Sequence, residues 1–183
     1  ALVEMRTQEK NRLGDAESTV SASIAQHLDY LEAQIDALKA QIESHIDQHP
    51  GLKQQQDLLD SIPGIGPATS AWLIGELNLT RFDSARQAAA FVGLTPRKDT
   101  SGTSVRGKPR LCKQGNGLLR KLLYFPALTA MTHNPLVRAL CLRLKAKGKH
   151  NMAIIAAAMR KLIHIAFGVL KSGKPFNPTL ADT

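Results

Sequence analysis

Cysteine, aromatic residues and acidic residues are scarce in this sequence, and each shortage narrows the choice of fold and function. Its two cysteines, Cys112 and Cys141, lie far apart with no Cys-x-x-Cys or Cys/His spacing around them. We therefore predict free thiols in a reducing compartment and no metal site in this chain. Aromatic residues make up 4% of a chain that is 43% hydrophobic. A core built from Ala, Leu and Ile favours packed helices over a sheet sandwich.

Long apolar runs and a leader segment are also missing from the sequence. No apolar stretch approaches the roughly 20 residues that cross a bilayer, and no basic segment followed by an apolar one opens the chain. We therefore expect a cytoplasmic protein that has no membrane partner. The sequence starts at Ala1 without an initiator methionine, and we expect it to be a fragment of a longer protein.

Acidic residues almost disappear from the second half of the chain. Residues 1–96 carry 7 Lys and Arg and 13 Asp and Glu, a net charge of −6, whereas residues 97–183 carry 17 and 2, a net charge of +15; together they give the overall +9. This asymmetry predicts a polyanionic partner, nucleic acid, because the cations alternate with core-forming helices instead of forming a tail. Solubility alone is the alternative interpretation.

The acidic half contains a heptad pattern that is typical of a coiled coil. Its apolar positions, spaced 4, 3, 4, 3 and 4 residues apart, are Ile24, Leu28, Leu31, Ile35, Leu38 and Ile42. We expect these residues to form the seam of a homo-oligomer, a dimer or higher. An amphipathic helix that lies on its own domain is the alternative. The Pro50-Gly51 pair is expected to end this helix, so we assign residues 1–50 to connecting helices and a coiled coil.

The remaining residues, 51–183, predict a compact helical domain, so the expected fold class is mainly all-α. Helices are expected at residues 67–77, 84–91, 117–131, 135–146 and 152–170. The last of these is nearly all apolar and is expected to lie at the centre of the core. The polar, Gly-containing segment 93–109 predicts a loop or a small hairpin.

The turn at residues 62–67, Ile-Pro-Gly-Ile-Gly-Pro, resembles that of helix-hairpin-helix DNA-binding modules, here spanning 58–77. Its glycines are expected to adopt positive φ and to let a phosphate approach the backbone. Its isoleucines would anchor the turn to the core, and the amides after it would face an anion at a helix N-terminus. A plain Gly-rich connection is the alternative. The residues expected to contact phosphate are Gly64, Gly66, Ala68 and Thr69.

Residues 97–110 place five cations around four hydroxyl groups. A serine that attacks a phosphodiester needs cations to stabilise the phosphate oxygens, and it needs an exposed position on a turn. Ser101, which precedes Gly102, meets both needs. These residues alone do not separate Ser101 from Ser104, and a loop that only contacts phosphate has the same composition.

Several strings of sequence together resemble the C-terminal domain of a known family. Within residues 58–126 they include Phe-Val-Gly-Leu-Thr-Pro-Arg at 91–97, Ser-Gly-Thr-Ser-Val-Arg-Gly at 101–107 and Lys-Gln-Gly-Asn at 113–116. Matching strings also occur at 5–13, 159–162 and 168–173. The chain resembles the transposases of the insertion-sequence one-hundred-and-ten family, which are related to Piv-type DNA invertases and are also called bridge-RNA-guided recombinases.

This resemblance implies that the first serine of the motif, Ser101, is a nucleophile that forms a phosphoserine link to DNA during strand exchange. It also implies two partners, DNA and a structured guide RNA that supplies the sequence reading. A RuvC-like domain with four acids would bind divalent metal, expected to be Mg²⁺. We expect that domain to be missing from this chain, which would then hold no cofactor and would not cleave DNA alone.

The resemblance and the basic composition predict further nucleic-acid contacts around the serine loop. They are Arg97, Lys98, Arg106, Lys108, Arg110, Lys113 and Arg120. Two other functions stay open from the residues alone. One is a non-catalytic nucleic-acid-binding module, in which Ser101 only contacts phosphate. The other is an oligomerisation module, in which residues 23–47 carry the function.

Overall fold

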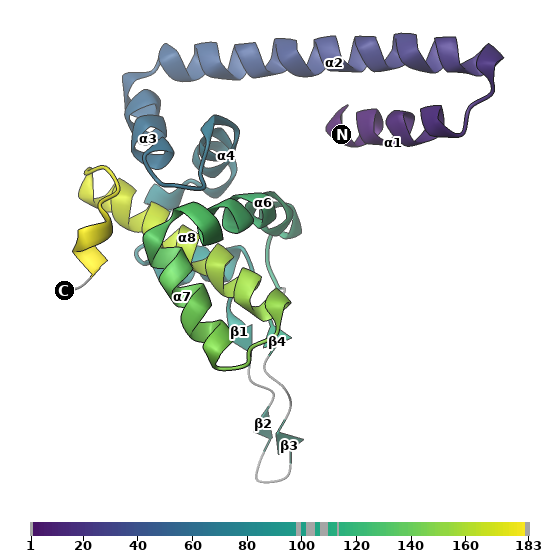
Figure 1. Ribbon diagram of the computed structural model, residues 1–183. Coiled ribbons are helices and arrows are strands. Elements are labelled where there is room, and N and C mark those ends of the chain that lie inside the picture. The colour runs from purple at the N-terminus through teal and green to yellow at the C-terminus, as the bar shows by residue number, and fades with distance from the viewer. Residues whose placement is uncertain (1, 98–99, 102–104, 107–109, 113, 182–183) are drawn as a thin grey trace. The chain divides into compact units, whose positions relative to one another are not determined.

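The computed structural model describes residues 2–97, 100–101, 105–106, 110–112 and 114–181. The chain divides into two compact units, Ala1–Lys53 and Gln54–Thr183. The described residues are mainly helical, and their four strands are two residues long each (Figure 1). The predicted all-α class is confirmed.

The first unit is a helical hairpin in which α1 (Leu2–Gly14) packs against α2 (Ser18–Asp47) (Figure 1). Polar side chains also join the helices: Nζ of Lys10 forms an ion pair with the Glu32 carboxylate at 3.1 Å, and the Glu9 carboxylate lies 3.5 Å from Nδ1 of His27. Such half-exposed pairs contribute little individually. The apolar contact between the helices therefore provides most of the stability of this unit.

The expectation that all six heptad positions form a seam between chains needs correction. Its first four residues are already buried in the single chain, whereas Leu38 and Ile42 are 45% and 50% exposed. The first half of the heptad pattern therefore encodes packing within one chain. The buried positions are Ile24, Leu28, Leu31 and Ile35.

This division predicts different outcomes for two matched substitutions on α2. Leu31→Asp places a carboxylate at a position that is 1% exposed, so we expect it to destabilise the helical hairpin by about 3 kcal/mol or more. Leu38→Asp changes a position that is exposed in the single chain and should alter the stability of the monomer by less than about 1 kcal/mol. Circular dichroism melting of the two variants measures the difference. Equal losses would show that Leu38 is buried as deeply as Leu31.

The second unit is built around α8 (Asn151–Ser172), which packs against α5 (Ala85–Phe91), α6 (Gly117–His133) and α7 (Pro135–Ala146). Along α8, Ala158, Leu162, Ile163 and Ala166 are 0% exposed. The prediction of a central core helix is thus confirmed. By length and composition alone α8 could cross a membrane, contrary to the sequence expectation, but 56% of its apolar window is buried in the protein.

The helix boundaries follow capping residues that the sequence contains. Pro50 starts α3 (Pro50–Asp60) instead of only ending the helix before it. Asn116 and Asn134 cap α6 and α7 by accepting hydrogen bonds from two backbone amides each. After α4 (Pro67–Trp72) the chain continues as a π-helical turn, η1 (Leu73–Leu77), and then a short 3₁₀ turn, η2 (Leu79–Arg81). A second short 3₁₀ turn, η3 (Pro178–Ala181), follows α8.

Both cysteines are free, as predicted. Cys141 is buried, and burial raises the pKa of its thiol. Cys112 donates a hydrogen bond from Sγ to Oε1 of Gln114 at 3.2 Å.

Candidate functional site

The basic serine segment forms a β-hairpin between α5 and α6. Strand β1 (Pro96–Arg97) pairs antiparallel with β4 (Arg110–Leu111), and β2 (Thr100–Ser101) pairs antiparallel with β3 (Val105–Arg106) (Figure 1). The sequence predicted either a loop or a small hairpin here, and the strand pairing shows a hairpin.

The ladder fixes the backbone positions of the predicted site residues. Ser101 lies on β2 opposite Val105, immediately before residues 102–104. Arg97 and Arg110 occupy directly opposite positions on β1 and β4. Three predicted contacts lie outside the described residues: Lys98, Lys108 and Lys113.

Two glycines close the root of the hairpin. Gly93 and Gly115 have φ of +77° and +141°, a region that favours glycine. A Cβ on Gly115 would collide with the carbonyl oxygen of Phe91, and one on Gly93 would lie 2.9 Å from the carbonyl oxygen of Gln114. The two chain segments that enter and leave the hairpin are therefore in close backbone contact.

Two arginines from different helices hold the same root. Nη1 of Arg120, on α6, donates hydrogen bonds to the carbonyl oxygens of Val92 at 2.9 Å and Gly115 at 3.4 Å. Nη1 of Arg160, on α8, donates to the carbonyl oxygen of Leu94 at 3.2 Å. Arg120 therefore has an internal contact where the sequence predicted nucleic acid. Sequence reasoning missed Arg160, because only the fold brings it to residue 94.

The turn between α3 and α4 is anchored as predicted, with Ile62 0% and Ile65 6% exposed. Gly64 has φ +105°, and its missing side chain faces α6: a Cβ there would lie 2.7 Å from Cβ of Ala130 and 2.9 Å from the carbonyl oxygen of Pro126. The expectation that Gly64 lets a phosphate approach is therefore replaced by a packing role against α6.

Fewer groups of this turn are available to bind an anion than the sequence predicted. Gly66 has φ −122°, not a positive φ, and a Cβ there would meet nothing within 4 Å. The amide of Thr69 is not free, because it donates to the carbonyl oxygen of Gly66 at 2.8 Å. Within the described part of the chain, the Ala68 amide has no acceptor. Of the four residues predicted to contact phosphate, Gly66 and Ala68 therefore remain available to an anion.

Side chains from distant segments tie the turn to the domain. The Asn134 side chain, 0% exposed, donates from Nδ2 to the carbonyl oxygen of Pro63 at 3.3 Å. Oγ of Ser61 accepts a hydrogen bond from the backbone amide of Phe176 at 2.8 Å. The turn is thus fixed to α7 and to the segment after α8. These contacts join residues 71 and 115 positions apart, so local sequence gave no signal for them.

A neutral histidine lies among cations where α5 meets α8. Burial lowers the pKa of His164, and the charges of Arg160, Lys161 and Arg86 lower it further. Its Nε2 atom is buried and has no hydrogen-bond partner among the described residues. At neutral pH the imidazole is uncharged, and the cations beside it keep their excess positive charge.

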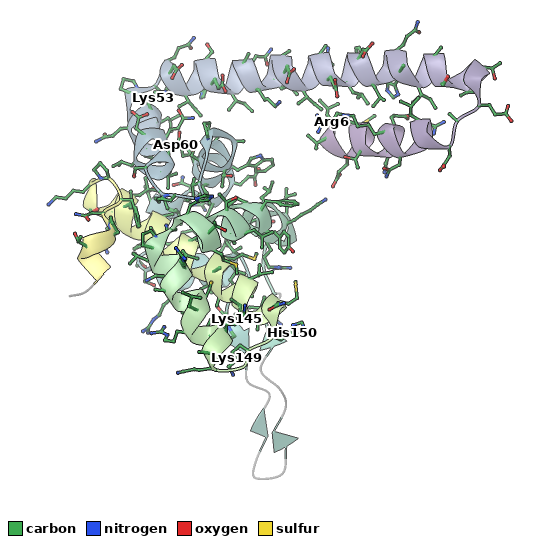
Figure 2. All side chains as sticks on the ribbon, viewed as in Figure 1. Arg6, Lys53, Asp60, Lys145, Lys149 and His150 are labelled. Atoms are coloured by element: carbon green, nitrogen blue, oxygen red, sulfur yellow. The ribbon has the colours of Figure 1, made fainter. Side chains whose placement is uncertain are left out.

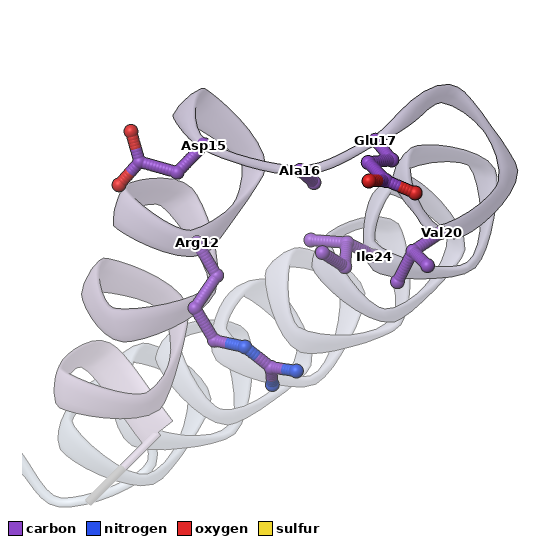
Figure 3. A pocket seen from close by; sticks show the side chains of 6 residues that line it. All are labelled: Arg12, Asp15, Ala16, Glu17, Val20 and Ile24. Atoms are coloured by element: carbon purple, nitrogen blue, oxygen red, sulfur yellow. The ribbon is translucent and has the colours of Figure 1, made fainter.

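The described residues offer no metal-binding cluster, and the surface pocket found among them does not include the serine segment. They hold no group of three or more His, Cys, Asp or Glu side chains that could bind a metal ion. A surface pocket of about 330 Å³ lies in the first unit, at the turn between α1 and α2 (Figure 3). It is lined by side chains of both charges and by apolar ones, and of the predicted site residues only Ile24 lines it.

Comparison with known proteins gives one family and several relatives. Residues 56–141 match the model of the transposase IS116/IS110/IS902 family. The chain is 33% identical over 150 residues to a pilin gene-inverting protein of Moraxella bovis, covering 81% of this chain and 47% of that protein. It is 33% identical over 156 residues to an IS110 insertion element protein of Streptomyces coelicolor, covering 84% of this chain and 37% of that one. A putative transposase of Sinorhizobium fredii is 32% identical over 176 residues. The chain spans less than half the length of each of these three proteins.

Proposed function

We propose that this chain, whose residues 56–141 match the transposase IS116/IS110/IS902 family, is the DNA-binding and strand-exchange part of a transposase. Its hairpin carries the nucleophile, Ser101, inside the matched region. One observation supports this proposal most strongly: the hairpin ladder places a serine on β2 and an arginine pair, Arg97 and Arg110, at opposite positions on β1 and β4. Arginine binds phosphate through bidentate, charge-assisted hydrogen bonds, so an arginine pair in the hairpin that carries the serine suits a phosphate partner.

The proposed reaction is a transesterification at phosphorus. Oγ of Ser101 attacks a DNA phosphodiester, a bond from Oγ to phosphorus forms, and the bond from phosphorus to one deoxyribose oxygen breaks. That oxygen leaves as a hydroxyl after it gains a proton, and the serine loses one. The phosphoserine ester keeps the strand attached until a second deoxyribose hydroxyl attacks it. Arginine and lysine side chains of the hairpin would stabilise the negative charge on the phosphate oxygens.

A divalent metal is part of the proposal but is assigned to another domain. When bound, Mg²⁺ would polarise the phosphate. The described residues offer no ligand cluster for it, so no residue of this part of the chain is given a metal-binding role. We propose that the 183-residue chain needs a RuvC-like domain, on its own chain or on a partner, before a covalent adduct forms.

The other partners are proposals of the same kind. We propose a structured guide RNA that pairs with target and donor DNA, a cytoplasmic location, and association of chains through Leu38 and Ile42, the exposed part of the heptad. The turn at residues 62–67 would add a sequence-independent backbone grip at Gly66 and Ala68. The alternative is a non-catalytic binding module. It is favoured by the buried anchoring of this turn, and it predicts binding without an adduct.

Binding through the hairpin predicts a change in salt dependence. Replacing Arg106, Lys108 and Arg110 together by alanine removes three cations, and each lost phosphate contact reduces the magnitude of the negative slope of log K against log salt by about 0.9 on duplex DNA. The expected fall is therefore about 2.7. Fluorescence anisotropy of a labelled duplex between low and moderate salt measures this slope. An unchanged slope would show that the hairpin cations do not contact phosphate.

A further inference from the structure

A second strongly charged surface, outside the hairpin itself, lies along α7 and the turn that follows it. Five cations occur between residues 138 and 149, and no Asp or Glu occurs from residue 100 to residue 181. All five side chains are exposed, and none forms an ion pair with a described residue. Figure 2 shows Lys145, Lys149 and His150 together at the end of α7. We call this set the α7 surface: Arg138, Arg143, Lys145, Lys147 and Lys149.

The fold explains which face of α7 carries these charges. Val137 and Cys141 are buried and fix the inner face of the helix, and Arg138, Leu142 and Lys145 lie together on one exposed flank beside that face. Leu142 is 59% exposed between the two cations. The spacing of 3 to 4 residues places the three side chains next to one another on the helix surface. The turn after the helix, with Gly148 at φ +67°, then adds Lys147 and Lys149.

Two simpler explanations account for only part of this surface. Cations near a helix C-terminus interact favourably with the helix dipole, which suits Arg143 and Lys145 in the last turn. The same dipole disfavours Arg138, which lies in the first turn. Solubility is served equally well by charges of both signs, yet acids are missing from this whole stretch. An acid-free group of exposed cations on a helix of about 18 Å and on the turn after it matches the dense negative charge of a nucleic-acid backbone.

We propose that the α7 surface binds the phosphate backbone of duplex nucleic acid, as a second contact separate from the serine hairpin. This inference rests on the proposed function. In the view of Figure 1 the C-terminal end of α7 and the strands β1 and β4 lie toward the same end of the second unit, and the proposal is that one duplex contacts both. The contact reads charge and not sequence, so DNA and RNA duplexes present the same chemistry to it.

The test compares three variants of the full chain by their salt dependence. In the first, Arg138, Lys145 and Lys149 are replaced by glutamine, which keeps the side chains polar. On a DNA duplex the magnitude of the slope of log K against log salt is expected to fall by about 2.7, which is three times the 0.9 of one phosphate contact. Lys174→Gln is the control, because Lys174 is exposed beyond the end of α8, and its slope should stay that of the parent. The third is the hairpin triple variant, and equal melting temperatures exclude misfolding.

The outcomes separate this inference from the proposed function. A smaller slope magnitude for the α7 variant on DNA or RNA duplexes supports binding by the α7 surface. The duplex on which the slope changes identifies the nucleic acid that is bound. If the hairpin variant loses slope and the α7 variant keeps the parent slope on both duplexes, the inference is wrong and the proposed function stands. Unchanged slopes for both variants overturn both.

Discussion

Replacing Ser101 by alanine is expected to abolish the covalent protein–DNA adduct in a protein that combines this chain with a RuvC-like metal domain. Alanine has no Oγ, so no phosphoester can form at that position, and no neighbouring residue is expected to substitute for it. Binding to the same DNA should remain within about threefold, because the hairpin cations are intact. Denaturing gel electrophoresis of protein incubated with labelled DNA measures the adduct.

Ser104→Ala is the matched control for this experiment. Both serines belong to the same segment, and Ser101 lies on β2 opposite Val105. We expect the adduct to persist with Ser104→Ala. An adduct that survives the loss of Ser101 would show that another hydroxyl is the nucleophile. Robust cleavage by the isolated chain would contradict the need for a metal domain.

Gly64→Val is expected to lower the free energy of unfolding of the second unit substantially. Valine at φ +105° carries backbone strain of about 1–3 kcal/mol. Its Cβ would also lie 2.7 Å from Cβ of Ala130 and 2.9 Å from the backbone of α6, an overlap that costs about 1–3 kcal/mol. A combined loss of about 3 kcal/mol or more corresponds to a fall in melting temperature on the order of 10 °C. Differential scanning calorimetry measures it.

Gly66→Ala, two residues further along the same turn, gives the contrast. Its φ of −122° suits any residue, and a Cβ there meets nothing within 4 Å. We expect stability to change by less than about 1 kcal/mol, so that a loss of DNA affinity in this variant would report a phosphate contact. Comparable destabilisation by both substitutions would contradict the packing role assigned to Gly64 alone.

The helices could be predicted because their signals are local. Asn116 and Pro135 mark where α6 and α7 begin, and the apolar run of α8 matches its buried position. The heptad pattern of α2 was recognised, but a pattern does not identify its partner. The same spacing is satisfied by α1 of the same chain over Ile24 to Ile35.

The contacts that hold the hairpin could not be predicted, because they join segments far apart in sequence. Arg160 reaches the carbonyl of Leu94, and Arg120 reaches that of Val92. From sequence, an arginine that bonds a backbone carbonyl and one that bonds a phosphate are alike. The turn at residues 62–67 shows the same limit: its two glycines look equivalent, yet one packs on α6 and the other faces open space.

The measurement that tests the central claim most directly is mass spectrometric mapping of the trapped adduct. Digestion with nuclease and trypsin leaves a nucleotide on the peptide from Asp99 to Arg106, which contains Ser101 and Ser104. Fragment ions of that peptide are expected to carry the added phosphate mass on Ser101. The same mass on Ser104, on a threonine of this peptide or on a peptide outside the hairpin would contradict the assignment of the nucleophile.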